Sequence, residues 1–224
     1  MGNTSHHHGH RQRLRDRFLK AGFDGFAPHE VVELLLTLAI PRRDVKPQAK
    51  ALLEEFGSLA NILDAPIEEL EKVPGVGRTA AVALKVIKEA TALYLQERMK
   101  QTGRPVTKRE LIEMWTMRLS GLKHEVFEVA FLDMGNQLMK VMRLNEGTVD
   151  RVAVYPRRIV EEALRIGAAS IVLAHNHPGG DPDLSPSDQK LTEVIRQACK
   201  LVDIEVLEHI VIPGSDNPTL SKSA

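Results

Sequence analysis

Hydrophobic positions in the first hundred residues recur at spacings of three and four, which is typical of amphipathic helices. Pro28 opens one such run and Pro41 ends it, because proline suits the first turn of a helix and interrupts a longer one. Gly57 ends the next run, since glycine is common where a helix stops. We expect helices between these two prolines, at 46–56, from 58 onward, at 67–70 and at 79–99.

A different pattern follows, in which short apolar runs alternate with helical ones. The runs 126–132 and 138–144 are joined by the turn-forming residues 133–136, so we expect two paired strands. Further strands are expected at 170–174 and 204–212, and helices at 156–166 and 187–202. We predict no helix or strand for residues 106–125. Alternating strands and helices predict an α/β sandwich for this half.

The boundary between the halves is expected at residues 101–105, a polar segment with Gly103 and Pro105 close together. The predicted organisation is an all-α domain at 1–102 followed by an α/β domain at 107–224. The chain can build a substantial core, since 43% of its residues are apolar.

The charges balance, with 30 basic and 30 acidic residues among 224. Net charge therefore gives no general argument for a nucleic-acid partner. The N-terminal segment is locally basic through Arg11, Arg13, Arg15, Arg17 and Lys20. Such a segment could contact phosphate, but the overall balance favours the solvent-exposed face of a helix.

The cysteine content and the length of the apolar runs indicate the cellular compartment that we expect for the protein. Cys199 is the single cysteine, which excludes an intramolecular disulfide and is typical of a reducing compartment. It lies in a helical pattern, so we expect a buried residue rather than a nucleophile. No apolar run approaches the length that spans a bilayer, and the N-terminus carries no secretory pattern. We expect a cytoplasmic protein without a membrane partner.

Two histidines, His175 and His177, follow the apolar run at 170–174. Side chains two residues apart in an extended chain point to one face, so both imidazoles can bind one zinc ion. A loop rich in proline and glycine follows and can turn back, and Asp188 can then supply a carboxylate oxygen. Two histidines, one aspartate and a water would leave the open position that a catalytic zinc site needs.

The same residues also have an interpretation without metal. Two histidines around an asparagine can form a hydrogen-bonded strand end. Ser185, Pro186 and Asp188 fit the N-cap, the first and the third position of a helix, where the aspartate bonds back to the cap. That helix start would account for Ser185 and Asp188 without a ligand.

The full spacing of His175, His177, Ser185 and Asp188 resembles the signature of JAMM metalloenzymes at every fixed position. The wider chain resembles the RadC family in the stretches 9–14, 74–77, 124–127, 147–149, 155–157 and 175–188. The resemblance implies a JAMM/MPN-like, cytidine-deaminase-like sandwich after an N-terminal helix-hairpin-helix domain. It also implies zinc as the cofactor and hydrolysis of a peptide or isopeptide bond in an unknown substrate.

The JAMM resemblance implies one more residue, a glutamate just before a core strand that acts as general base on the water. Glu125 matches, because it directly precedes the expected strand 126–132. Glu128 lies inside that strand and Glu146 follows the next one, so both fit less well. Without the histidine motif, Glu125 would be interpreted as a surface carboxylate at a strand end.

Other residues around the motif have weaker expected roles. The resemblance gives Ser185 the role of hydrogen-bonding the developing oxyanion. Asp181, Asp183 and His209 are further candidates, either as substitute ligands or as hydrogen-bond partners of the ligands. We rank these three below the residues of the motif.

Residues 73–78 lie between two expected helices and resemble a helix-hairpin-helix. Gly75 and Gly77 permit a tight turn, and the next helix offers free N–H groups to a phosphate. Arg78 and Lys85 could add positive charge. A plain interhelical turn used for packing explains the same residues equally well. DNA binding through this hairpin would be weak and sensitive to salt.

Three functions are compatible with this sequence. The leading one is a zinc-dependent hydrolase with an attached helical domain. The second is a DNA-associated accessory protein in repair or recombination, whose hairpin binds DNA and whose metal is structural. The third is a metal-free scaffold, against which the intact His175, His177 and Asp188 argue.

Overall fold

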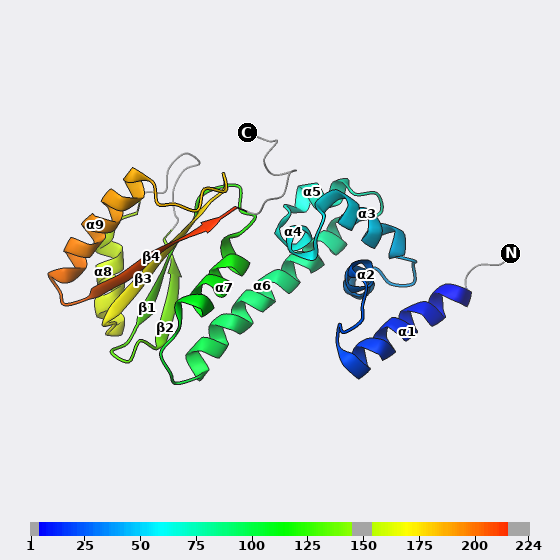
Figure 1. Cartoon of the computed structure of the whole chain (residues 1–224), viewed down its shortest axis with the longest axis horizontal. Helices are drawn as coiled ribbons and strands as arrows, with labels where there is room; N and C mark the ends of the chain where they lie inside the picture. The colour runs from blue at the N-terminus through cyan, green and yellow to red at the C-terminus, as the bar shows by residue number, and fades with distance from the viewer. Residues whose placement is uncertain (1–4, 145–153, 215–224) are drawn as a thin grey trace. The chain divides into compact units, whose positions relative to one another are not determined.

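The structure is a computed structural model that describes residues 5–144 and 154–214 (Figure 1). The chain divides into two compact units inside helix α6 (Arg78–Gln101), between Lys88 and Glu89. The second half of this helix packs apolar side chains into the core of the second unit, so the division lies before the linker that the sequence predicts. None of the described helices is long and apolar enough to cross a bilayer.

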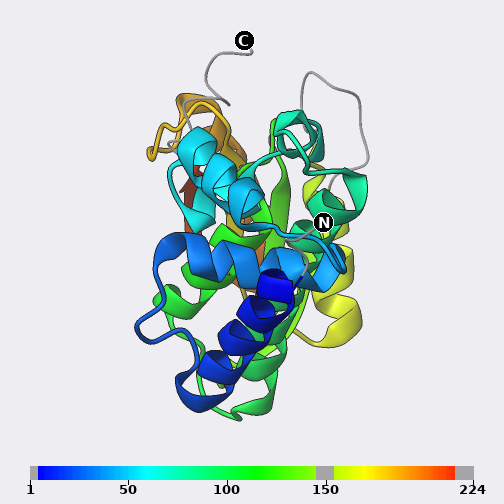
Figure 2. The same ribbon diagram turned by 90° about the vertical axis from the view of Figure 1, so that its right-hand side faces the viewer.

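The first unit is helical, as the sequence predicts. Its helices before α6 are α1 (Ser5–Ala21), α2 (Pro28–Ala39), α3 (Lys46–Phe56), α4 (Leu59–Asp64) and α5 (Ile67–Lys72). Figure 2 shows α1 and α2 with the loop that joins them. α1 exposes Arg13, Arg15 and Lys20, a position compatible with either a solvated helix face or a contact with phosphate. Buried apolar residues of α2 to α5 and of the first half of α6 form one core.

Two tight turns in the first unit depend on glycine. Gly57 between α3 and α4 has φ 77°, and Gly75 between α5 and α6 has φ 84°, a backbone region that disfavours other residues. Space is also restricted at Gly75, because an added Cβ would lie 2.5 Å from Nε2 of Gln48. The unit therefore contains two helix–turn–helix segments with a glycine at the turn, and only the second was predicted to be a helix-hairpin-helix.

The second unit contains a four-stranded sheet with the strand order β2-β1-β3-β4. β1 (Phe127–Leu132) pairs antiparallel with β2 (Leu138–Arg143) and with β3 (Ser170–His177), and β4 (Glu205–Pro213) pairs parallel with β3. All four strands lie close to their predicted positions. β3 continues beyond the expected end at residue 174, so both histidines of the motif belong to the strand.

Helices cover both faces of the sheet, which confirms the predicted α/β sandwich (Figure 1). α8 (Pro156–Ile166) and α9 (Pro186–Lys200) pack on one face, against Ile171 and Leu173 of β3. α7 (Lys108–Leu119) packs on the other face, against the even-numbered residues of the same strand. Odd-numbered residues of β3 therefore face α8 and α9.

Helix α7 is an element that the sequence analysis did not predict. Its start carries a recognisable signal, because Thr107 and Glu110 form a capping box in which each side chain accepts the other's backbone N–H. Trp115 is fully buried and anchors the helix on the sheet. On the opposite face, Cys199 of α9 is buried, as predicted.

Candidate metal centre

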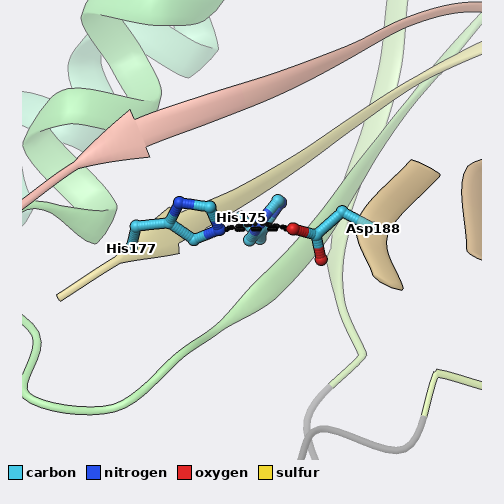
Figure 3. Close-up of side chains that lie close together, drawn as sticks. All are labelled: His175, His177 and Asp188. Carbon is cyan, nitrogen blue, oxygen red and sulfur yellow. Dashed lines mark hydrogen bonds and ion pairs between the residues drawn. The ribbon is translucent and has the colours of Figure 1, made fainter. Parts of the chain in front are cut away.

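The two histidines of the motif lie at the C-terminal end of β3, on the face that α8 and α9 cover. The alternation that packs Ile171 and Leu173 against these helices places His175 and His177 on the same side. The chain then returns to this face, where α9 begins with Asp188 in its first turn. The strand end and the helix start thus bring the two imidazoles and the carboxylate together (Figure 3).

One side-chain atom of each of the three residues lies close to one atom of each of the other two. Nε2 of His175 lies 2.8 Å from Nε2 of His177, and Oδ2 of Asp188 lies 3.5 Å and 3.4 Å from these two nitrogens. Ligand atoms about 2.0–2.2 Å from a tetrahedral zinc ion lie roughly 3.3–3.5 Å from one another. The two nitrogen–oxygen distances match this separation, and the nitrogen–nitrogen distance would have to widen by about half an ångström.

The second nitrogen of His177 is held by the loop that follows β3. Nδ1 of His177 lies 2.9 Å from the carbonyl oxygen of Asp181, which can only accept, so this nitrogen carries the proton. Asp181 thus contacts the histidine through its backbone, while its side chain accepts the N–H of Asp183 at 2.9 Å. Within the described chain, the group that could hold an ion includes neither of these aspartates.

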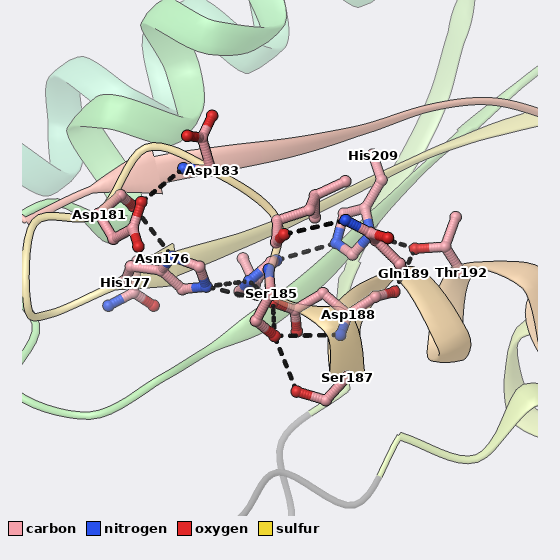
Figure 4. Close-up of polar contacts among 12 residues, drawn as sticks. Asn176, His177, Asp181, Asp183, Ser185, Ser187, Asp188, Gln189, Thr192 and His209 are labelled. Carbon is pink, nitrogen blue, oxygen red and sulfur yellow. Dashed lines mark hydrogen bonds and ion pairs between the residues drawn. The ribbon is translucent and has the colours of Figure 1, made fainter.

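The second nitrogen of His175 is held by a chain of three hydrogen bonds (Figure 4). Thr192 Oγ1 donates to the carbonyl oxygen of Asp188 at 2.6 Å, so it accepts from Nδ1 of His209 at 2.6 Å. Nε2 of His209 is then unprotonated and accepts from Nδ1 of His175 at 2.9 Å. These proton positions are assigned from the hydrogen-bond partners, and they leave the Nε2 lone pair of His175 free for a metal.

Burial and hydrogen bonds set the charges of the centre. Burial lowers the pKa of His175 below its usual value and the pKa of His209 to about 3. The pKa of Asp188 is also lowered, since burial opposes ionisation but the hydrogen bond from Ser185 and the proximity of His175 outweigh it. Neutral imidazoles and an ionised carboxylate are the protonation states that zinc binding requires.

The donor set fits a zinc ion. With the protons placed as above, two nitrogen lone pairs and one carboxylate oxygen point into the same small space. Such an arrangement is repulsive by itself and becomes favourable around a cation. Imidazole and carboxylate are ligands that zinc commonly takes, and a third histidine is positioned to orient one of them.

The start of α9 also holds Asp188. Ser185 is the N-cap, and the carboxylate of Asp188 accepts its backbone N–H at 2.9 Å and its hydroxyl at 2.6 Å. The helix start that we weighed against a metal site is therefore present. The two interpretations are compatible, because the cap orients the carboxylate towards the histidines and leaves it ionised.

Glu125 lies just before β1, the strand that pairs with the histidine strand. Phe127 pairs with His175, and continuing this antiparallel register by two residues sets Glu125 opposite His177. Alternation along β1 puts Glu125 on the same face as Phe127, which belongs to the core under α8 and α9. The side chain of Glu125 is exposed. Glu125 precedes the paired residues of β1, which begin at Phe127, so its placement on the histidine side of the sheet is an extrapolation of the strand alternation.

Asn176 fixes this end of the sheet, although the sequence analysis gave it no role. Its Oδ1 accepts the backbone N–H of Val126 at 2.8 Å, and its Nδ2 donates to the carbonyl oxygen of His124 at 3.1 Å. The side chain is buried and takes the place of ladder hydrogen bonds beyond Phe127. A buried asparagine between two histidines therefore ties the Glu125 segment to the histidine strand.

Glu128 and Glu146 are the other two candidates for the general base. Glu128 lies on the α7 face of the sheet and is fully buried. Its carboxylate accepts hydrogen bonds from Arg118 at 2.8 Å and 2.9 Å, from Arg143 at 3.0 Å and from Trp115 at 3.2 Å. This position on the opposite face argues against Glu128 as a base at the histidines. Glu146 lies outside the described residues.

The predicted hairpin residues Gly75, Gly77 and Arg78 lie together at the turn before α6. The carbonyl of Gly77 accepts the first helical hydrogen bond from Ala80, and the space beyond Gly77 is open. Arg78 is exposed and lies 3.6 Å from Glu71, whose charge offsets part of its own. The turn can therefore present the backbone N–H groups of α6 to an anion. The positive charge of Arg78 beside them is partly offset by Glu71.

Comparison with known proteins identifies both parts of the chain. Residues 106–222 match a family model described as a RadC-like JAB domain, and residues 47–90 match one described as a SAM-like helix-hairpin-helix tandem. A Ruegeria pomeroyi protein named UPF0758 protein SPO0054 is 38% identical over 213 residues, which cover 92% of each chain. This chain belongs to the RadC family.

RadC membership confirms the predicted resemblance and the predicted fold class, a JAB/MPN-like α/β domain after a helical hairpin domain. The tandem match also covers both glycine turns, Gly57 and Gly75, where the sequence analysis predicted a single hairpin. The earlier turn was predicted as a helix end at Gly57, but it was not interpreted as a hairpin because it lacks the Pro-Gly-x-Gly pattern of the later one.

Thr192 supplies a test of the hydrogen-bond chain in this RadC protein. Thr192→Val keeps the shape of the side chain but removes the hydroxyl between His209 and the Asp188 carbonyl. We expect zinc affinity to fall roughly tenfold, because groups that orient a metal-bound histidine typically contribute this much. Competition with a fluorescent chelator measures the affinity. Thr192→Ser should restore it, and an unchanged affinity in Thr192→Val would show that the chain does not orient His175.

Proposed function

We propose that this RadC family protein is a zinc-dependent hydrolase that cleaves peptide or isopeptide bonds. One observation carries the proposal. Two histidine nitrogens and a carboxylate oxygen converge, and hydrogen bonds to the outer ring nitrogens leave the converging lone pairs free for a metal. His175, His177 and Asp188 would hold the ion, and the RadC-like JAB match is in keeping with such a site.

Zinc, when bound, supplies Lewis acidity and makes a water reactive at neutral pH. The residues around the site would do the remaining work. Glu125 would take a proton from the attacking water and deliver it to the leaving amine, the two tasks of a general base that becomes a general acid. Its place two residues before Phe127, which pairs with His175, supports this role.

Ser185 has one hydroxyl proton, and the described geometry directs it to Asp188. The hydroxyl also lies 2.7 Å from Oγ of Ser187, which can donate to it. In our proposal Ser185 orients Asp188 before substrate binds. Stabilisation of the developing oxyanion, the role we expect from the JAMM resemblance, requires the hydroxyl to turn from Asp188 towards the substrate.

The proposed activity is tested on the full chain loaded with zinc. A fluorogenic library of peptides and Lys-linked isopeptides is incubated with the protein, and cleavage is followed by fluorescence and mass spectrometry. We expect cleavage that stops on treatment with a chelator and returns when zinc is added. Cleavage that persists at full rate in the metal-free protein would contradict the proposal.

A second candidate function is supported by the tandem helix-hairpin-helix match and by the open turn at Gly77. In it the helical unit binds DNA and the metal is structural. The N-terminus of α6 would bind a phosphate through backbone N–H groups, with little help from Arg78 because Glu71 lies close to it. This function can accompany hydrolysis in the other unit.

DNA binding is tested with a charge change at the turn. Gly77→Asp should keep the start of α6, since aspartate is a good N-cap, but its carboxylate would repel a phosphate. We expect the full chain to bind a short duplex more weakly, with the largest loss at low salt, where repulsion between the carboxylate and a phosphate is least screened. Gly75 is unsuitable for this test, because a side chain there would collide with Gln48.

Gly77→Ser is the matched control, because serine caps the helix equally well without adding charge. Fluorescence anisotropy at several salt concentrations compares the three proteins. Equal affinities for Gly77→Asp and Gly77→Ser would rule out phosphate contact at this turn. Absence of binding by the unmodified chain at low salt would remove the DNA function altogether.

A further inference from the structure

A groove of about 630 Å³ follows the outer edge of β4, next to the proposed metal centre. Residues 208–211 of β4 lie between its two walls. One wall is the start of α7, and the other is the loop between β3 and α9. The wall residues are Lys108 and Ile112 on α7, and Pro182, Asp183, Leu184 and Gln189 across from them. The groove therefore borders both the strand edge and the loop that carries the histidine contacts.

β4 is the last strand of the sheet on this side, and within 5–144 and 154–214 no strand pairs with its outer edge. The N–H of Gly214 donates inward to the carbonyl of His177 at 2.8 Å. Inward and outward backbone groups alternate along a strand, so His209 and Val211 direct their N–H and C=O groups outward into the groove. Pro213 occupies the next outward position, where the lack of an N–H costs no ladder bond.

An extended peptide is the occupant that such an edge fits. A row of outward N–H and C=O groups is matched by another extended backbone, as in recognition by strand addition. The charged residues that line the groove are Lys108, Asp183 and Glu208, and Lys108 is paired with Glu208. One cation against two anions disfavours a nucleic-acid backbone, whose binding depends on uncompensated positive charge.

His209 and Val211 connect the groove to the metal centre, although none of the three proposed ligands lines the groove itself. Val211 pairs with His175 in the parallel β3–β4 ladder, and the ring of His209 bonds to the ring of His175. Strands in a sheet are about 4.8 Å apart, so a peptide added beside β4 would run roughly 10 Å from the backbone of His175. Peptide residues beyond the paired segment can therefore reach the site.

We propose that the outer edge of β4 binds the substrate as an added strand, so that the substrate class is an extended, unfolded polypeptide segment. This inference rests on the proposed hydrolase function. The paired contacts would be to the backbone of His209 and Val211, which makes recognition largely independent of sequence. Side chains of the bound segment would contact the walls formed by Ile112 and Leu184.

The test uses amide hydrogen exchange of the full zinc-loaded chain, measured by NMR, with a tryptic digest of casein as the source of unfolded peptides. At peptide concentrations about tenfold above the dissociation constant, exchange at His209 and Val211 should slow roughly tenfold. The inward amides of Ile210 and Ile212 should not change, because they already bond to β3.

Two variants of Val211 separate backbone recognition from side-chain effects. Val211→Pro removes the outward N–H without removing a bond to β3, and prolines are tolerated on edge strands. It should lose the protection of His209 by peptide, whereas Val211→Thr, which keeps the N–H, should retain it. Zinc content and chelator-sensitive cleavage of the library, measured on the same samples, report separately on the metal centre and on the proposed hydrolase function.

Several results would overturn the proposal. One such result is that amide exchange at His209 and Val211 does not change at the highest peptide concentration, in protein that keeps its zinc. Protection of these amides without peptide, together with a dimer by light scattering, would assign the edge to a second copy of the chain. Protection by single-stranded DNA but not by the casein digest would assign it to nucleic acid.

Discussion

Replacing His175 and His177 together with alanine is expected to abolish tight zinc binding, reducing about one ion per chain to none. Both Nε2 atoms point at the same place, and removal of both leaves only the carboxylate of Asp188 there. A single oxygen ligand cannot hold zinc against water and a competing chelator. Titration with a chelator of known affinity, followed by elemental analysis, measures the loss.

The N-terminal histidine run at 6–8 requires a control, because it can bind zinc weakly by itself. Replacing His6, His7 and His8 with alanine removes this contribution and should leave the tight site intact. His177→Ala alone should remove most of the tight binding. Full occupancy with unchanged affinity in the double variant would mean that the motif does not hold the metal.

Glu125→Gln is expected to lower hydrolysis by about two to four orders of magnitude, the range usual for a general base. The amide keeps the size of the side chain but cannot take a proton at neutral pH. Zinc content should remain near one per chain, because Glu125 is outside the group of ligand atoms. The rate is measured on a substrate from the peptide and isopeptide library, with zinc determined on the same protein.

Glu205→Gln provides the matched control, since Glu205 is another exposed glutamate at the start of a strand. It should hydrolyse the substrate at the normal rate. Asp188→Asn should differ from Glu125→Gln by losing zinc together with activity. A near-normal rate in Glu125→Gln would remove Glu125 as the base and make Glu146, which follows β2, the next residue to test.

Local signals in the sequence predict much of this structure. Pro28, Pro41 and Gly57 mark helix ends that the structure retains, and apolar runs mark all four strands. The His-x-His motif and the cap at Ser185 are likewise local patterns. Each depends on residues that are near one another in the chain, which is why the pattern alone predicts them.

Features that depend on distant residues escaped prediction. β3 extends through His177 because parallel pairing with β4 continues to Pro213, which no local pattern indicates. Thr192 and His209 meet across 17 positions, from α9 to β4, and their contact requires the folded domain. Glu128 accepts hydrogen bonds from Arg118 of α7 and Arg143 of β2, and these contacts also require the folded domain.

The central claim, that His175, His177 and Asp188 hold zinc, is tested most directly by anomalous diffraction from zinc-loaded crystals. Data recorded above and below the zinc absorption edge locate the ion independently of activity. We predict one strong peak about 2.0–2.2 Å from Nε2 of both histidines and from a carboxylate oxygen of Asp188. A fully occupied peak elsewhere in the chain, with none between these three side chains, would contradict the account.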